Sequence, residues 1–573
     1  MKALLYSLVT STFFLFIFTC AASAQDKAVW PTWGGDLENT HQGIDSPLIT
    51  PDTVKNLKVK WVYETHGDVS AIPVVSEQNV YFPDWGTPFV GGLTGGSYLH
   101  ALDRETGRSV WSKSILRYSK NLLNSVARSS FAISGDLLIF GDNRGFIDSI
   151  LSVHGSKGAS VYALNRTTGE LVWKTRLDSN QLSIITQSPV IYNGKVYVGT
   201  ASNEEASARF TKDCCTFRGS MAALDLQTGR ILWQTYMVPE GKGFTGNAVW
   251  GSQPSIDVKR HAVYIATGNN YTFPQSLKTC LPIFKGKPEQ QQTECYDKFD
   301  RPDNYASSVL ALDLDTGAIK WARKLENYGA WTYACDPKLA PGIPIKPSNC
   351  DDLTSLDFDF GQAPMLVHTH KDGVEKDIVA VGQKNGVFWA FDPDHEGSTL
   401  WTTPVGPGGT LGGMEFGSAT DNEKVYVQIT NFDHTEYLIT AGPQAGKKVH
   451  GGSWAALDAV SGKILWQTPD PRSSEPLKGI LAHPSFGAFR GEGFFATDKG
   501  PMAVNNGVVF AGSMDRKGHM YGLDSRDGRV IWSFASGGSV MSAPAIVDNV
   551  LYWGSGYSKT GFAGNKFYAF GLR

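Results

Sequence analysis

One pattern of apolar and polar positions recurs along the chain. An apolar strand-like run is followed by a tight turn on Asp or Asn, Thr and Gly, and then by a second strand-like run that ends on Trp. Such a phrase predicts a β-hairpin, because turn residues join two strand-like segments. The copies are "ALDRETGRSVW" (101–111), "ALNRTTGELVW" (163–173), "ALDLQTGRILW" (223–233), "ALDLDTGAIKW" (311–321), "AFDPDHEGSTLW" (390–401), "ALDAVSGKILW" (456–466) and "GLDSRDGRVIW" (522–532).

The spacing of these copies predicts the architecture. Their tryptophans are 62, 60, 88, 80, 65 and 66 residues apart. Most copies follow two more strand-like runs, such as "SPVIYNGKVYVGT" before the third. Four strands per repeat at this spacing are typical of a β-propeller blade. The repeated tryptophans then have a packing role, and we assign them no chemistry.

The two ends of the chain complement each other. Trp61, in "LKVKWVYET", lies in an outer strand that lacks its preceding half, and "KFYAFGLR" (566–573) is an inner half without a Trp strand. Joined, they make an eighth blade and close the ring, which leaves no sheet edge exposed. We therefore expect an all-β protein, a single eight-bladed propeller domain over residues 25–573, closed by its N- and C-terminal strands.

The first 24 residues have the features of a secretory signal peptide: a basic Lys2, an apolar run from Ala3 to Phe18, and Ala22-Ser23-Ala24 at its end. We expect a secreted or periplasmic protein, and no later stretch is apolar for long enough to span a membrane. With 52 basic and 55 acidic residues and no basic stripe, nucleic acid and anionic membranes are poor partners.

Six cysteines remain after such a signal peptide, in a compartment where pairing is the default. Cys280, Cys295, Cys335 and Cys350 divide into two local pairs, although other connectivities are open. No C-x-x-C-H motif occurs, so we expect no haem on this chain.

Cys214 and Cys215 are adjacent in "DCCTFRG". Consecutive Cα atoms are about 3.8 Å apart, below the usual disulfide range of about 4.4–6.8 Å, which makes an ordinary structural staple a poor explanation. The alternative is a pair of reduced, buried thiols.

The tryptophan-docked repeat, eight times over, resembles the quinoprotein alcohol dehydrogenases, whose members bind pyrroloquinoline quinone and Ca²⁺ on the propeller axis. The resemblance covers almost the whole mature chain, and "NEEASARFTKDCCTFRGSMAALDLQTG" (203–229) is most similar to the polyvinyl-alcohol-dehydrogenase-like branch. It implies a quinone contact at Thr186, and calcium ligands at Glu204, 18 residues later, and at Asn269. Glu205 is the substitute ligand if the register differs by one.

Further positions follow from the same resemblance. Trp250 matches the tryptophan whose ring lies under the quinone, and a Cys214–Cys215 disulfide on the opposite face would complete a sandwich. Lys384 matches the basic residue that faces the quinone oxygens, where a cation stabilises developing charge. Arg128 is a weaker match, to a residue that pairs with a cofactor carboxylate.

One position departs from the family pattern. Methanol- and ethanol-oxidising members carry a Trp-Asp pair whose Asp is the general base, and the matching stretch here, "ENYGAWTYACD", has Thr332 after Trp331. Threonine is not a base near neutral pH. Either Asp336 or another carboxylate takes the role, a different base is used, or the site no longer oxidises alcohols.

Two functions follow. The preferred hypothesis is an exported quinoprotein dehydrogenase that oxidises a small-molecule or polymeric alcohol, a secondary alcohol among the candidates. It does so by hydride transfer to pyrroloquinoline quinone and passes electrons to an external acceptor such as a cytochrome. The alternative is a secreted propeller that has lost redox activity and acts as a binding protein or non-redox catalyst at the same axial pocket.

Overall fold

The structure is a computed structural model that describes residues 26–86, 96–120, 124–125, 129–144, 158–211, 213–281, 289–325, 329–336, 347–351, 356–371, 373–473 and 496–572. The expected signal peptide and Arg128 lie outside these residues. Among the residues described, no helix has both the length and the apolar character to cross a membrane.

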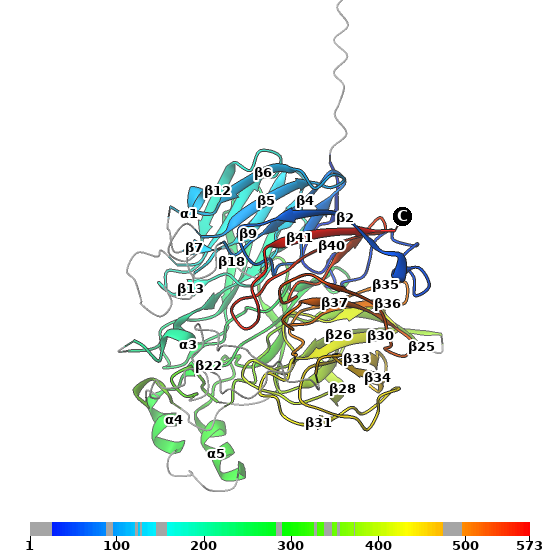
Figure 1. Ribbon diagram of the computed structural model, residues 1–573. Helices are drawn as coiled ribbons and strands as arrows, with labels where there is room; N and C mark the ends of the chain where they lie inside the picture. Colours follow the sequence, from blue (N-terminus) through cyan, green and yellow to red (C-terminus); the bar gives the residue numbers. More distant parts are fainter. Residues whose placement is uncertain are drawn as a thin grey trace, which may run out of the picture.

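Eight antiparallel sheets follow one another around a ring (Figure 1). Blade 1 contains β1 (Ala28–Trp30), β3 (Val74–Ser76), β4 (Asn79–Pro83), β5 (Tyr98–Asp103) and β6 (Ser109–Ser114). Blade 2 contains β8 (Ala132–Ser134), β9 (Leu137–Gly141), β11 (Ser160–Asn165) and β12 (Leu171–Arg176). Blade 3 contains β14 (Val190–Tyr192), β15 (Lys195–Gly199), β17 (Ser220–Asp225) and β18 (Ile231–Tyr236). Blade 4 contains β20 (Ser255–Asp257), β21 (Ala262–Ala266), β23 (Ser308–Asp313) and β24 (Ile319–Lys324).

The other four blades repeat this order. Blade 5 contains β25 (Met365–Lys371), β26 (Val374–Gly382), β27 (Val387–Asp392) and β28 (Ser398–Pro404). Blade 6 contains β29 (Ala419–Thr420), β30 (Lys424–Ile429), β33 (Ser453–Asp458) and β34 (Ile464–Pro469). Blade 7 contains β35 (Met502–Asn505), β36 (Val508–Gly512), β37 (His519–Asp524) and β38 (Val530–Ala535). Blade 8 contains β39 (Ala545–Val547), β40 (Val550–Gly554), β41 (Lys566–Gly571) and β2 (Lys58–Glu64).

Loops between the blade strands carry short ladders and helices. The ladders pair β7 (Asn124–Ser125) with β10 (Asn143–Arg144), β13 (Ser183–Ile184) with β16 (Ala201–Ser202), β19 (Thr245–Gly246) with β22 (Asn270–Thr272), and β31 (Tyr437–Leu438) with β32 (Lys448–Val449). The helical segments are η1 (Val54–Asn56), α1 (Leu116–Ser119), α3 (Glu204–Ser207), α4 (Gln275–Cys280), α5 (Glu289–Phe299) and η3 (Pro347–Asn349).

Blade 8 is built from both ends of the chain, which confirms the prediction from the two incomplete halves. β2 pairs antiparallel with β41, from Lys58 opposite Gly571 to Glu64 opposite Lys566. The blue and red strands lie side by side in Figure 1. The hydrogen bonds of this pairing close the ring, so the eight-bladed fold expected from the repeat is the fold observed.

Each repeat tryptophan docks its blade on the next one. The indole Nε1 of Trp173 donates a 2.9 Å hydrogen bond to the carbonyl of Leu226, and the ring covers Gly229, whose φ is +70°. A Cβ at Gly229 would lie 2.5 Å from the ring, so the Gly of the turn is needed for both its conformation and its size. The same indole-to-carbonyl bond is made by Trp61, Trp111, Trp233, Trp401 and Trp466.

Three disulfides join the six cysteines. Cys214 pairs with Cys215, Cys280 with Cys295, and Cys335 with Cys350. The cysteines of each local pair are 15 positions apart in sequence, and these are the two pairs that the sequence spacing suggests. The alternative of reduced vicinal thiols is not the state of this structure.

Candidate functional site

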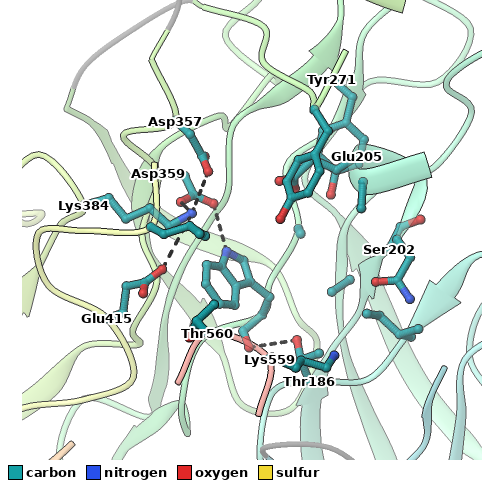
Figure 2. Close-up of a pocket in the computed structure, with 18 of the residues that line it drawn as sticks. Thr186, Ser202, Glu205, Tyr271, Asp357, Asp359, Lys384, Glu415, Lys559 and Thr560 are labelled. Atoms are coloured by element: carbon teal, nitrogen blue, oxygen red, sulfur yellow. Dashed lines mark hydrogen bonds and ion pairs between the residues drawn. The ribbon is translucent and has the colours of Figure 1, made fainter. Parts of the chain in front are cut away.

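Loops of several blades line a cavity that is open to solvent and has a volume of about 170 Å³. Figure 2 shows Asp357, Asp359, Lys384 and Glu415 on one side of this view, with Glu205 and Tyr271 across from them. The residues that line it include Thr186, Trp250, Asp357, Lys384, Lys499 and Thr560.

Lys384 lies at the centre of a buried charge cluster. The loop between β26 and β27 carries it, and its Nζ lies 2.9 Å from Asp357 Oδ2, 2.7 Å from Asp359 Oδ1 and 4.0 Å from Glu415 Oε1. Burial by itself lowers the pKa of Lys384, but Asp357, Asp359 and Glu415 outweigh it and raise this pKa well above its usual value. Lys384 is therefore charged, and it lines the cavity as the sequence predicts.

Asp357 is a carboxyl group suited to proton transfer. Burial is the largest influence and raises its pKa well above the usual value, although Lys384 opposes the shift. Its Oδ1 is buried and accepts no hydrogen bond from the residues described, while Oδ2 accepts one from Lys384. A carboxyl group whose pKa is raised toward the operating pH can work as a general base.

Trp250 presents its indole to the cavity. The loop between β18 and β20 carries it, and Thr186 Oγ1 donates a 3.0 Å hydrogen bond to its carbonyl. Its Nε1 donates a 2.9 Å hydrogen bond to Asp359 Oδ2, and Lys384 Nζ lies 5.0 Å from the ring centroid. A flat aromatic ligand can stack on such a fixed indole.

Glu204 and Glu205 begin helix α3, and they face different surroundings. Glu204 Oε2 accepts hydrogen bonds from the backbone N–H groups of Thr216 (2.9 Å) and Phe217 (2.8 Å). Its Oε1 accepts one of 2.8 Å from Asn180 and one of 2.9 Å from the Thr216 hydroxyl. Glu205, not Glu204, is among the residues that line the cavity. The substitute register that the sequence leaves open is therefore the one the geometry favours.

Asn269 has an unused side-chain oxygen. Its Nδ2 donates to the carbonyls of Asn270 (3.1 Å) and Trp331 (3.0 Å). Its Oδ1 is buried and has no hydrogen-bond partner among the described residues. A buried carbonyl oxygen left unpaired is costly, and a hard cation such as Ca²⁺ takes ligands of this type.

The vicinal disulfide flanks the cavity but does not line it. Cys215 packs against the apolar cluster of Ile184, Ala201, Phe217, Ala248 and Tyr271, next to Trp250. Cys214 faces a second cluster, around Trp331 and Cys335. The Cys215 sulfur thus approaches the same apolar patch as the Trp250 ring.

The remaining sequence candidates lie elsewhere. Thr332 is fully buried, and its hydroxyl donates to the carbonyl of Asn349 (2.9 Å). Asp336 accepts a 3.2 Å hydrogen bond from the Thr410 hydroxyl and is not among the lining residues. Arg128 is outside the described residues. Neither Thr332 nor Asp336 is among the residues that line the cavity.

Sequence reasoning missed five charged residues of the cavity. They are Asp357, Asp359, Glu415, Lys499 and Lys559. The available signal was "DFDFG" at 357–361, two carboxylates separated by one residue, just before the first strand of blade 5. A Glu415 oxygen lies 2.7 Å from Lys499 Nζ, so the cluster contains negative and positive side chains next to each other.

Comparison with known proteins finds relatives that cover more than nine-tenths of this chain. A family model described as outer membrane protein assembly factor BamB matches residues 146–270 and 450–570. A polyvinylalcohol dehydrogenase of a Pseudomonas species is 29% identical over 558 residues, covering 92% of this chain and 73% of that protein. Quinohemoprotein alcohol dehydrogenase of Comamonas testosteroni is 25% identical over 609 residues, covering 94% and 74%. The solved structure of a europium-containing methanol dehydrogenase shares the fold, with a TM-score of 0.62 at 15% identity, covering 95% of this chain and 98% of that one.

Proposed function

The chain is related over most of its length to the quinoprotein alcohol dehydrogenases, polyvinyl alcohol dehydrogenases among them, and on that premise we propose that it is a pyrroloquinoline quinone-dependent alcohol dehydrogenase. The observation that carries the proposal is the arrangement of Trp250, Lys384 and Asp357 around one cavity: an aromatic platform, a buried cation and a carboxyl group with a raised pKa.

The residues present fit the cofactor and its metal ion. Trp250 offers the face on which a planar quinone stacks, and Cys215 bounds the neighbouring apolar patch. Glu205 and the unpaired Oδ1 of Asn269 offer oxygen ligands to Ca²⁺. When bound, the quinone supplies the hydride acceptor and the calcium ion polarises it as a Lewis acid.

The chain itself supplies the proton transfer and the electrostatics. Asp357, in its carboxylate form, takes the proton of the substrate hydroxyl, and Lys384, 2.9 Å from Asp357 Oδ2, stabilises that carboxylate form before the transfer. Asp359 holds Lys384 and the Trp250 indole in place through its two oxygens. Asp357 thus fills this role in place of Thr332 and Asp336, neither of which lines the cavity.

The finer assignments rest on the relatives and the sequence. We propose an alcohol substrate that is secondary or polymeric, in line with the polyvinylalcohol dehydrogenases among the relatives. We also propose export by the N-terminal segment as a single-domain protein, and an external electron acceptor such as a cytochrome.

The test is a titration of the purified protein with pyrroloquinoline quinone, with and without Ca²⁺, read by tryptophan fluorescence and by dye reduction with alcohols. We expect calcium-dependent quinone binding and turnover. Asp357→Asn should bind quinone with unchanged affinity and lose about 10²–10⁴-fold in turnover. If the wild-type protein did not bind the quinone, the alternative hypothesis of a binding protein or a non-redox catalyst with the same fold would replace this proposal.

A further inference from the structure

Three metal-ligating side chains converge at the junction between blade 8 and blade 1, away from the cavity. They are His66, which follows β2, Asp84, which follows β4, and His100, within β5; we call them the junction triad. His66 Nδ1 lies 3.3 Å and His100 Nε2 lies 3.0 Å from the same atom, Asp84 Oδ2. One ligand atom of each residue lies within 4.8 Å of the other two.

The carboxylate of Asp84 is oriented by the backbone. Its Oδ1 accepts hydrogen bonds of 2.9 Å from the N–H groups of Gly86 and Tyr98. Oδ2 accepts one of 2.9 Å from the N–H of His66. The direction in which Oδ2 points therefore does not depend on the two imidazoles.

The two rings are also held by their surroundings. His66 stacks on Tyr98 with ring centroids 3.7 Å apart and an interplanar angle of 10°. His100 is fully buried and stacks on Phe82 at 5.0 Å. The His66 side chain is 42% exposed, so one side of the triad is open to an entering ion. Preorganised ligands with fixed ring orientations are typical of metal sites.

The neighbouring blade shows what the fold itself requires at this position. In blade 2, Tyr162 pairs with Phe140 across the sheet, as His100 pairs with Phe82 in blade 1. The Tyr162 hydroxyl donates a 2.7 Å hydrogen bond to Asp142, which stands two residues after Phe140 just as Asp84 stands two after Phe82. In blade 2 the Asp at this position thus accepts a phenol hydroxyl and not an imidazole.

Blade 1 departs from this arrangement in two ways. It has an imidazole in place of the phenol, and His66 brings a second imidazole to the same oxygen. Both changes bring an imidazole nitrogen, which can ligate a metal ion, to Asp84 Oδ2. Neither imidazole is needed to satisfy Asp84, because its two oxygens already accept three backbone N–H groups.

We propose that the junction triad is a binding site for a divalent transition-metal ion of the zinc class. Two imidazole nitrogens and one carboxylate oxygen are the ligands such ions favour. A tetrahedral ion with bonds of about 2.0–2.1 Å places its ligand atoms about 3.3 Å apart, close to the 3.0 and 3.3 Å seen here. The fourth ligand position of such a tetrahedral ion faces solvent beside His66. The ion would link the blade made from both chain ends to blade 1, so it stabilises the ring closure.

The test is titration of chelator-treated full-length protein with Zn²⁺ in excess Ca²⁺, followed by calorimetry and by thermal unfolding. We expect one tight Zn²⁺ per chain and a rise in Tm. His66→Gln should weaken this binding by at least about 10-fold. His100→Tyr introduces the residue that blade 2 carries at the equivalent position, so it should fold and lose the site.

The matched control is His261→Gln. His261 is paired with one carboxylate, that of Asp315 at 2.9 Å, without a second imidazole, and its loss should leave Zn²⁺ affinity unchanged. Equal Zn²⁺ affinity of the wild type and His100→Tyr would overturn the proposal. So would a wild-type protein that binds no Zn²⁺ and whose Tm does not rise when Zn²⁺ is added.

Discussion

Trp250 and Asp359 are joined by a 2.9 Å hydrogen bond from the indole Nε1 to the carboxylate Oδ2. The other oxygen of this carboxylate lies 2.7 Å from Lys384 Nζ. The ring on which a planar ligand would stack and the cation that faces it are therefore positioned by one side chain. A change at any of the three residues should disturb the other two.

Trp250→Phe keeps an aromatic ring but removes the hydrogen bond to Asp359. We expect the affinity for pyrroloquinoline quinone to fall about 10-fold, the equivalent of about 1.4 kcal/mol, because the ring loses its fixed orientation and Asp359 loses a partner. Fluorescence titration measures the change. Trp173→Phe is the control: it also loses one indole hydrogen bond, to Leu226, and should lower the Tm while leaving quinone affinity unchanged.

Lys384→Gln removes the cation that three buried carboxylates share. Leaving such charges without their partner costs about 3–5 kcal/mol, so the midpoint of urea unfolding should fall. The double variant Lys384→Gln/Asp357→Asn should regain part of this stability, since one of the charges is gone, but no turnover. If the double variant were less stable than Lys384→Gln alone, repulsion within this cluster would not be the cause.

Glu204→Gln and Glu205→Gln should have different consequences. Glu204 accepts the backbone N–H groups of Thr216 and Phe217, and an amide nitrogen there would face a donor, so we expect a lower Tm in the calcium-free protein. Glu205 lines the cavity, and its amide variant should weaken Ca²⁺ binding with little change in that Tm. Calcium titration combined with thermal unfolding separates the two. If Glu204→Gln weakened Ca²⁺ binding and Glu205→Gln lowered the Tm instead, Glu204 would be the calcium ligand.

The fold could be predicted from the sequence because its information is local and repeated. A hairpin phrase such as 223–233 specifies two strands, their turn and the tryptophan that docks on the next blade. Once the seven copies are assigned to seven blades, the two chain ends can only form the eighth blade together. The strand that contains Trp61 lacks an inner partner, and the strand at 566–573 lacks an outer one. Each supplies what the other lacks, so their pairing follows from the repeat.

The site could be predicted only where the resemblance to the quinoprotein family supplies a matching motif. Thr186, Trp250 and Lys384 come from such motifs, and all three line the cavity. Glu204 and Glu205 are both in the first turn of α3, and the backbone at Thr216 decides which of them turns away. Asp357 lies in the long connection between β24 and β25, where no periodicity gives its register. Nothing local indicates that it, rather than Asp336, reaches the cavity.

Gly229→Ala tests the docking of blades independently of the site. Gly229 and Gly194 have φ values of +70° and +72°, but a Cβ at Gly229 would meet the Trp173 ring at 2.5 Å, whereas at Gly194 it would meet nothing within 4 Å. Gly194→Ala should cost about 1–2 kcal/mol for the left-handed conformation. Gly229→Ala should cost about 1–3 kcal/mol more, because Trp173 must move. Urea unfolding of both variants measures the difference, and equal losses would mean that the ring makes room for the methyl group.

His41 should make the fold sensitive to acid. It is fully buried, its two ring nitrogens have no hydrogen-bond partner among the described residues, and burial lowers its pKa from 6.5 to about 3. Because the folded pKa lies below the unfolded one, the unfolded chain binds the proton first as the pH falls below 6.5, and stability is lost over that range. The loss from this group should be about 2 kcal/mol by pH 5. His41→Asn removes the group, and Asn tolerates the φ of +56° at this position. The free energy of unfolding of the wild type minus that of His41→Asn should therefore decrease by about 2 kcal/mol between pH 7 and pH 5; a difference that stays constant would show that His41 is protonated in the folded protein.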